Sequence, residues 1–155
     1  MIKILFVCHG NICRSPMAEF VMKDMVEKAG LSDRFYIASA ATSAEELGNP
    51  VYPPVQKLLS KAGIGCSGKT ARQMKKRDYD EFDLLICMDG ANLHGMRRIC
   101  GGDPEDKMHR LLDYTDHPGD VADPWYTRDF TATWQDVQEG CAGLLKALDA
   151  EKREG

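Results

Sequence analysis

The sequence has no run of about 18 uninterrupted apolar residues, which is the length a helix needs to cross a membrane. It also shows no secretory signal. Met1-Ile2-Lys3 leads directly into an apolar stretch, without a basic segment, an apolar core and a small-residue cleavage site. We therefore expect a protein with no membrane segment that resides in the cytoplasm.

The spacing typical of zinc ligands is absent as well. The six cysteines stand at positions 8, 13, 66, 87, 100 and 141, with no Cys-x2-Cys pair and no neighbouring pair of histidines. Several of them fall in apolar segments, and the chain is neither short nor visibly exported. The sequence therefore predicts reduced thiols rather than disulfides, and no metal site.

A strong charge of either sign is also missing. The formal net charge is −4, which disfavours binding to nucleic acid, and any attraction to a phosphate must come from local groups. The 155 residues contain no internal repeat, low-complexity segment or linker, and 43% of them are hydrophobic. Residues 1–155 are therefore expected to form a single domain with one good core.

Apolar runs alternate with helical periodicity along the chain. Strands are predicted where nearly every residue is apolar, and helices where apolar residues recur at helical spacing. The predicted strands are 2–7, 35–38, 84–88 and 110–114. The predicted helices are 16–29, 54–62, 73–80, 90–99 (capped by Asp89) and 131–152, with long loops at 39–53 and 115–130. This order favours a three-layer α/β fold with a parallel sheet and helices on both faces, in which ligands bind beyond the carboxyl ends of strands.

The segment Phe6–Pro16, with the sequence FVCHGNICRSP, joins the first predicted strand to the first predicted helix. Gly10 and Asn11 tolerate left-handed backbone angles. Ser15 and Pro16 are typical of the N-cap and the first position of a helix. Because the N–H groups of a compact loop at a helix start bind anions, this segment predicts a cradle for phosphate.

Cys8 and Arg14 give the cradle its chemistry. A guanidinium can bind two oxygens of a tetrahedral oxyanion, and a thiolate is favoured beside cations and helix N-termini. We predict that Cys8 attacks the phosphorus of a phosphomonoester while Arg14 and the loop amides bind the non-bridging oxygens. The Cys-x5-Arg spacing alone would also suit a buried core cysteine and a surface cation. The predicted phosphate-binding residues are His9, Gly10, Asn11, Ile12, Cys13, Arg14 and Ser15.

Asn11 and Ser15 have supporting roles in this prediction. Asn11 would hydrogen-bond within the cradle, and the Ser15 hydroxyl would donate to the Cys8 thiolate. A plain turn at Asn11 and a plain N-cap at Ser15 are compatible with these roles, so the sequence does not choose between them.

The loop Val7–Pro16 resembles the phosphate loop of the low-molecular-weight protein tyrosine phosphatases. Further segments match the family in its order, namely Ser39–Ser43, Gly48–Pro50, Phe82–Asp89 and Asp123–Tyr126. The resemblance covers nearly the whole chain. It implies a four-stranded, flavodoxin-like sheet and removal of phosphate from protein tyrosine through a cysteinyl-phosphate intermediate, with phosphotyrosine-containing proteins as substrates. Because Arg14 and the loop bind the phosphate oxygens that a metal ion binds in other phosphatases, we expect no metal and no other cofactor. We also expect a monomer.

Asp123 matches the general acid of that family. It would protonate the leaving phenolate and then act as the base for water. From composition alone, an Asp-Pro pair in a polar loop is usually a turn. Pro124 biases Asp123 toward an extended conformation, and Trp125 and Tyr126 would supply an apolar wall that favours a protonated carboxyl.

The predicted substrate wall consists of Ile12, Glu45, Trp125 and Tyr126. A deep cradle walled by aromatic rings favours a flat aryl phosphate over a short serine ester. The family often carries an aromatic at the position of Glu45, whereas here an acid stands beside Glu46. These acids would disfavour acidic phosphopeptides and favour basic ones, or they face solvent without a role.

Two further residues follow from the resemblance. The family joins its loop asparagine and serine to a histidine on a later segment, but this chain has Lys69 there, so the resemblance does not say what closes that network. Cys13 matches the family's redox partner, which forms a disulfide with the oxidised nucleophile Cys8. A buried loop residue is the plainer interpretation of Cys13.

Three other functions are considered. Protein arginine phosphatases share the loop but typically carry threonine in place of Ile12. Thioredoxin-coupled arsenate reductases need two nearby redox cysteines, and Cys87 and Cys100 are separated by a predicted helix. A phosphate-binding module without catalysis is discouraged by the presence of Cys8, Arg14 and Asp123 together. The sequence thus favours a phosphotyrosine phosphatase.

Overall fold

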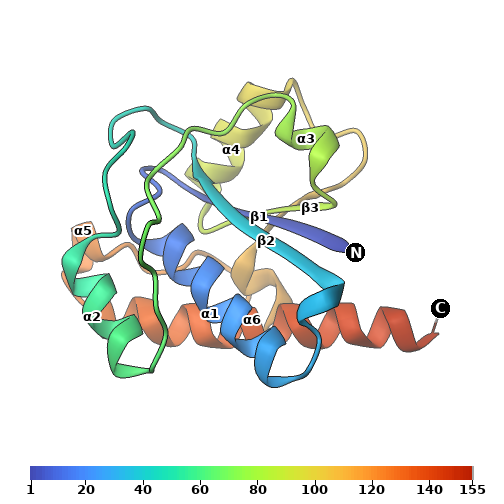
Figure 1. The fold of residues 1–155 in the computed structure, drawn as a ribbon. Helices are drawn as coiled ribbons and strands as arrows, with labels where there is room; N and C mark the ends of the chain where they lie inside the picture. Colours follow the sequence, from blue (N-terminus) through green and yellow to red (C-terminus); the bar gives the residue numbers. More distant parts are fainter. Residues whose placement is uncertain (155) are drawn as a thin grey trace.

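The computed structural model describes residues 1–154, and side chains as far as position 149 (Figure 1). The strands are β1 (Ile2–Cys8), β2 (Phe35–Ala41), β3 (Leu84–Cys87) and β4 (Met108–Arg110). The α-helices are α1 (Arg14–Lys28), α2 (Pro53–Lys61), α3 (Asp78–Glu81), α4 (Gly90–Cys100), α5 (Pro124–Thr127) and α6 (Phe130–Glu154). Short 3-10 helices cover Ser32–Arg34 and Leu111–Tyr114. None of the described helices is long and apolar enough to cross a membrane.

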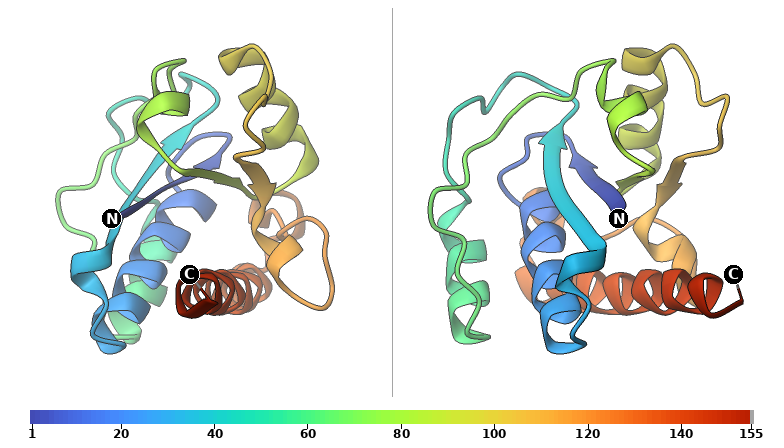
Figure 2. Two further views of the ribbon diagram at one scale, coloured as in Figure 1. Left: turned by 90° about the vertical axis from the view of Figure 1, so that its right-hand side faces the viewer. Right: turned by 45° about the vertical axis from the view of Figure 1, so that its right-hand side comes forward.

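The four strands form one parallel sheet in the order β2-β1-β3-β4. Helices α1, α2 and α6 lie on one face of the sheet, and α3 and α4 lie on the other (Figures 1 and 2). This is the predicted three-layer, flavodoxin-like arrangement. Strand β2 is added on one side of β1 and strand β3 on the other, so the strand order reverses between β1 and β3. In such a sheet the crevice beyond the carboxyl ends of these two strands is where ligands bind.

Strand β1 is buried on both faces, which explains its nearly continuous apolar sequence. Ile4 and Phe6 pack in the core cluster that contains residues of α1 and α6. Leu5 and Val7 point to the opposite face and pack in the cluster that includes Met96 of α4. Because both faces of β1 are fixed by packing, the position of Cys8 at its end is fixed too.

The predicted fourth strand is wrong in its extent. Strand β4 lies earlier, at Met108–Arg110, and residues Leu111–Tyr114 turn into a 3-10 helix. Leu111 is completely buried, and Gly140 of α6 lacks the Cβ that would collide with it. The apolar residues after position 110 therefore reflect packing against α6 rather than a strand.

Two smaller expectations also differ from the structure. The predicted helix 73–80 is shortened to α3, because Gln73 pairs with Ala41 in an extended bridge. The predicted loop 115–130 contains the short helix α5, which begins directly after Asp123. The second difference affects the wall of the crevice described next, because Trp125 and Tyr126 of α5 line it.

Candidate active site

A cleft of about 510 Å³ opens beyond the carboxyl ends of β1 and β3. Its lining includes the three predicted catalytic residues Cys8, Arg14 and Asp123. His9, Gly10, Ile12, Cys13, Glu45, Trp125 and Tyr126 also line it. The structure thus brings together residues from three distant segments that the sequence singled out. Asn11 and Ser15 are the predicted site residues that do not line the cleft; they lie buried behind it.

Polar groups of the loop converge on the sulfur atom of Cys8. The Ser15 hydroxyl oxygen lies 3.0 Å from Sγ. The backbone N–H groups of Asn11 and Ser15 donate to Sγ at 3.3 and 3.4 Å. These donors point to the atom on which a nucleophilic thiolate carries its charge.

The predicted N-cap at Ser15 is wrong. Helix α1 begins at Arg14, Cys13 takes the N-cap position without a side-chain cap bond, and Ser15 already lies in the first turn. The Ser15 hydroxyl is therefore free to contact the Cys8 sulfur and to accept a hydrogen bond from Asn11 Nδ2 at 2.8 Å. Ser15 serves the loop rather than the helix terminus.

The backbone of the loop follows the prediction at one of its two permissive residues. Asn11 adopts a left-handed conformation with φ of 60°, whereas Gly10 does not appear among the residues of positive φ. Space at Gly10 is tight instead: a Cβ there would lie 3.3 Å from Cγ of Glu46, so the Glu46 side chain would have to shift by a few tenths of an ångström. The loop is thus closed on its outer side by the segment around Glu46.

Asn11 connects the loop to β2 through a buried side-chain network. Its amide nitrogen donates to the Ser39 hydroxyl at 2.9 Å, and its amide oxygen accepts the N–H of Arg72 at 3.1 Å. Ser39 in turn donates to the carboxylate of Glu19 at 2.6 Å. Sequence reasoning did not assign Glu19 and Ser39 to this network. The available signal was that Glu19 stands four residues after Ser15, on the same face of α1.

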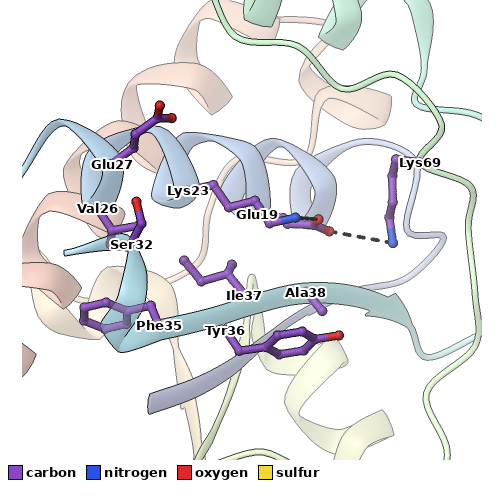
Figure 3. A pocket seen from close by; sticks show the side chains of 10 residues that line it. All are labelled: Glu19, Lys23, Val26, Glu27, Ser32, Phe35, Tyr36, Ile37, Ala38 and Lys69. Carbon is purple, nitrogen blue, oxygen red and sulfur yellow. Dashed lines mark hydrogen bonds and ion pairs between the residues drawn. The ribbon is translucent and has the colours of Figure 1, made fainter. Parts of the chain in front are cut away.

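Lys69 closes this network at its outer end. Its Nζ donates to the carbonyl oxygen of Ser39 at 3.0 Å and lies 3.7 Å from Oε1 of Glu19. Lys23 binds Oε2 of the same carboxylate at 2.6 Å. Both lysines line a second pocket of about 430 Å³ between α1 and β2 (Figure 3). Burial lowers the pKa of Lys69, and the opposing effect of Glu19 does not restore it. A lysine therefore supplies the donor at the position where the resemblance led us to expect histidine.

Arg14 is buried and oriented by groups on the other side of the cleft. Its Nη1 donates to the Asp89 carboxylate at 2.9 Å and to the carbonyl oxygen of Val121 at 3.1 Å. Its Nη2 lies 3.5 Å from the Asp123 carboxylate. Burial alone would lower the pKa of Arg14, but Cys8, Asp89 and Asp123 outweigh it and raise the pKa above its usual value.

Asp89 performs two tasks, of which the sequence indicated one. As predicted, it caps α4, since its Oδ1 accepts the N–H of Asn92 at 2.8 Å. Its Oδ2 holds Arg14. The signal for this second task was the position of Asp89 directly after a buried strand, at the same sheet edge as the phosphate loop.

Asp123 lies opposite Cys8 at the start of α5. Its Oδ1 accepts the N–H of Trp125 at 3.0 Å, and Oδ2 faces Arg14. The ring of Trp125 packs against Tyr52, with centroids 4.7 Å apart. Trp125 and Tyr126 are 53% and 88% exposed, so they form the outer rim of the cleft and do not enclose the carboxylate.

The acids on the opposite rim are both paired. Nε2 of His9 lies 2.9 Å from Glu45, and both side chains are largely exposed. The Asn49 side chain donates to Glu46 at 2.6 Å. Glu45 thus contacts the loop through His9, in the position where the resemblance led us to expect an aromatic side chain.

The cysteines of the described residues are free thiols. Burial, followed by the neighbouring Cys8, strongly raises the pKa of Cys13. Cys87 and Cys100 lie near opposite ends of α4, which disagrees with the close pair that arsenate reduction needs. Among the side chains that the structure describes, no group of three or more His, Cys, Asp or Glu is arranged to hold a metal ion.

Comparison with known proteins agrees with this geometry. The sequence model of the family "Low molecular weight phosphotyrosine protein phosphatase" matches residues 3–154. The low molecular weight protein-tyrosine-phosphatase YfkJ of Bacillus subtilis is 40% identical over 155 residues, covering 99% of both chains. Its crystal structure superposes with a TM-score of 0.94, covering 98% of this chain and 97% of that one.

Two further solved structures are similar. The low molecular weight protein tyrosine phosphatase SP-PTP of Streptococcus pyogenes has a TM-score of 0.86 at 40% identity, covering 96% of this chain and 93% of that one. DARP, a drosophila arginine phosphatase, has a TM-score of 0.86 at 29% identity, covering 95% and 98%. Fold and sequence together define the class, and the chain belongs to the low molecular weight phosphotyrosine protein phosphatase family.

Proposed function

We propose that this phosphatase hydrolyses phosphotyrosine in proteins with Cys8 as nucleophile, Arg14 as oxyanion clamp and Asp123 as general acid and base. The observation that carries this assignment is Arg14. It is buried beneath the cleft and contacts Asp89 and Asp123, while its loop surrounds the Cys8 sulfur. Nucleophile, cation and acid thus share one cleft.

In the first step, the Cys8 thiolate attacks phosphorus, forming a sulfur–phosphorus bond while the bond to the tyrosine oxygen breaks. The loop amides and Arg14 bind the three non-bridging oxygens, over which the negative charge is spread. Asp123 gives its proton to the leaving phenolate.

In the second step, water attacks the phosphorus of the cysteinyl phosphate. The ionised Asp123 accepts a proton from this water, the sulfur–phosphorus bond breaks, and inorganic phosphate and the Cys8 thiolate are released. The Ser15 hydroxyl, 3.0 Å from Sγ, is placed to stabilise the departing thiolate. The residues required for both steps belong to this chain.

Hydrolysis of matched phosphotyrosine, phosphoserine and phosphoarginine peptides, with EDTA present, tests the proposal. We expect turnover of phosphotyrosine and a loss of about 10²–10⁴-fold in Asp123→Asn, the range typical of a general acid. Asp129→Asn serves as the control, since Asp129 is exposed on the same segment. Preference for phosphoarginine would support the activity named for DARP, and absence of turnover would contradict phosphatase function.

Cys13 is proposed as a redox partner for Cys8. Peroxide would oxidise the Cys8 thiolate to a sulfenic acid, and condensation of this acid with the Cys13 thiol would form a disulfide and release water. Both residues are buried in the same short loop. Loss of activity in peroxide that thiols reverse in the parent protein, but not in Cys13→Ser, is the expected result.

The remaining assignments extend the same proposal. Ile12, Glu45, Trp125 and Tyr126 form the substrate wall, because they line the cleft around Cys8. The protein acts as a cytoplasmic monomer, residues 1–155 make one domain, and nucleic acid is not a partner. Sedimentation at concentrations used for kinetics checks the monomer.

A further inference from the structure

Thr133 is a polar residue in the first turns of α6, yet it is completely buried. Its hydroxyl donates to the carbonyl oxygen of Ala122 at 2.7 Å. One turn later, the carboxylate of Asp136 accepts the N–H of Ala122 at 3.0 Å. Helix α6 therefore binds both backbone polar groups of the residue that directly precedes Asp123.

The residue before Ala122 is fixed from the opposite side. The N–H of Val121 donates to the carbonyl oxygen of Met88 at 2.8 Å, and its carbonyl oxygen accepts the bond from Arg14. The N–H and carbonyl groups of Val121 and Ala122 are thus all hydrogen-bonded. Their partners lie at the end of β3, in the phosphate loop and on α6. The chain that carries Asp123 crosses from the sheet edge to the region above the start of α6 (Figure 1).

We propose that Thr133 and Asp136 are positioning residues that set the place of Asp123 relative to the leaving oxygen. The inference rests on the proposed role of Asp123 as general acid. Neither residue lines the cleft, so each acts through Ala122 rather than on substrate. A hydroxyl and a carboxylate suit this task, because they supply the one donor and the one acceptor that the backbone of Ala122 requires.

Leaving-group dependence separates positioning from simple stabilisation of the fold. A general acid matters most when the leaving oxygen is basic and least when it departs readily as an anion. A displaced Asp123 should therefore slow phenyl phosphate hydrolysis more than 2,4-dinitrophenyl phosphate hydrolysis. A partly unfolded protein would lose the same fraction of its activity toward both substrates.

The central variant is Thr133→Val, which removes the donor and nearly preserves the side-chain volume. We expect kcat/KM for phenyl phosphate to fall about 10-fold, and that for 2,4-dinitrophenyl phosphate to change by less than about twofold. Thr133→Ser retains a hydroxyl and should recover most of the loss. Thr131→Val, an exposed substitution of the same kind two residues away, is the matched control. Equal losses toward both substrates, or no loss toward either, would overturn the proposal.

Asp136→Ala provides a second variant if Thr133→Val does not fold, with the same expected split between substrates. Asp123→Asn measured in parallel distinguishes a failure of the proposed general acid from a failure of the proposed positioning by α6. Absence of leaving-group dependence in Asp123→Asn would contradict the proposed general acid itself. Its presence in Asp123→Asn, with none in the Thr133 and Asp136 variants, would contradict only the positioning by α6.

Discussion

The two segments that face each other across the cleft are built differently. In the phosphate loop, Cys8, Asn11 and Ser15 are buried and contact one another within seven residues of sequence. The acid segment around Asp123 is largely open, and its backbone is fixed by partners on β3 and α6. The contacts to the Cys8 sulfur thus come from residues close in sequence, whereas the backbone before Asp123 is held by residues from distant parts of the fold.

This difference has a consequence for what each side tolerates. A change in the phosphate loop alters contacts with the reacting sulfur directly, so its effect should be large and independent of the leaving group. A change around the acid segment acts through Asp123 and should depend on the leaving group. Variants on the two sides of the cleft should therefore differ in how their losses depend on the leaving group.

The largest effect is expected for Cys8→Ser. A serine hydroxyl in the same cradle is a far weaker nucleophile, so turnover of an aryl phosphate should fall by about 10⁴-fold or more. Binding of inorganic phosphate should persist, because the loop amides and Arg14 remain. Turnover close to that of the parent enzyme would contradict a thiolate mechanism. Isothermal titration with phosphate provides the control for an intact loop.

A smaller loss is expected for Asp89→Asn. Asparagine caps a helix as well as aspartate does, so α4 should remain stable. The charge that orients Arg14 is removed, however, and misplacement of a clamp group can reduce kcat/KM by about 10²-fold. Asp120→Asn, which also alters a contact to the first residue of α4, serves as the comparison. Equal activity in the two variants would show that the ion pair of Arg14 and Asp89 does not orient the clamp.

Lys69→Met tests the outer end of the Asn11 network. We expect about a 10-fold reduction in kcat/KM with every leaving group, because loss of the Ser39 contact loosens the loop around Cys8. Lys69→His should restore most activity. Lys23→Met removes the more exposed partner of Glu19 and should change activity little, since Lys23 makes no hydrogen bond to Ser39. Equal losses in Lys69→Met and Lys23→Met would assign the effect to the charge of Glu19 alone.

The smallest effect is expected for His117. It lies on the loop that leads to Asp123, and its ring contacts Glu139 of α6. The hydrogen bond and charge of Glu139 raise the pKa of His117 above its usual value of 6.5. The contact with Glu139 therefore stabilises the folded protein fully below pH 6.5. This stabilisation is lost as the pH rises through the raised pKa that His117 has in the folded state. We expect His117→Gln to lower Tm slightly at pH 6 and not at pH 9. A difference that grows with pH would contradict this pairing.

Much of the fold followed from the sequence because β1 and β3 are buried on both faces and read as continuous apolar runs. The left-handed angle at Asn11 and the cap at Asp89 are local features, so residue types alone indicated them, whereas the helix that begins after Asp123 was not predicted. Residues Leu111–Tyr114 were misassigned because their apolar pattern reflects contact with α6, which lies far along the chain.

The site residues that the sequence did not reveal were also missed because their contacts join segments far apart in the chain. Glu19, Ser39 and Lys69 meet only after α1, β2 and the segment before α3 have packed together. Thr133 reads as an ordinary polar residue of an amphipathic helix until Ala122 is placed against it. The sequence thus indicated the reacting groups more readily than the groups that hold them in place.

Direct detection of a phosphorylated Cys8 is the most direct test of the central claim. Asp123→Ala should slow breakdown of the intermediate, so rapid acid quenching during turnover of p-nitrophenyl phosphate should trap it. We expect the mass of one phosphoryl group on the peptide that contains Cys8, with none on Cys13, and its loss in Cys8→Ser. Steady turnover without any trapped phosphorylated cysteine in the quenched Asp123→Ala protein would contradict the account.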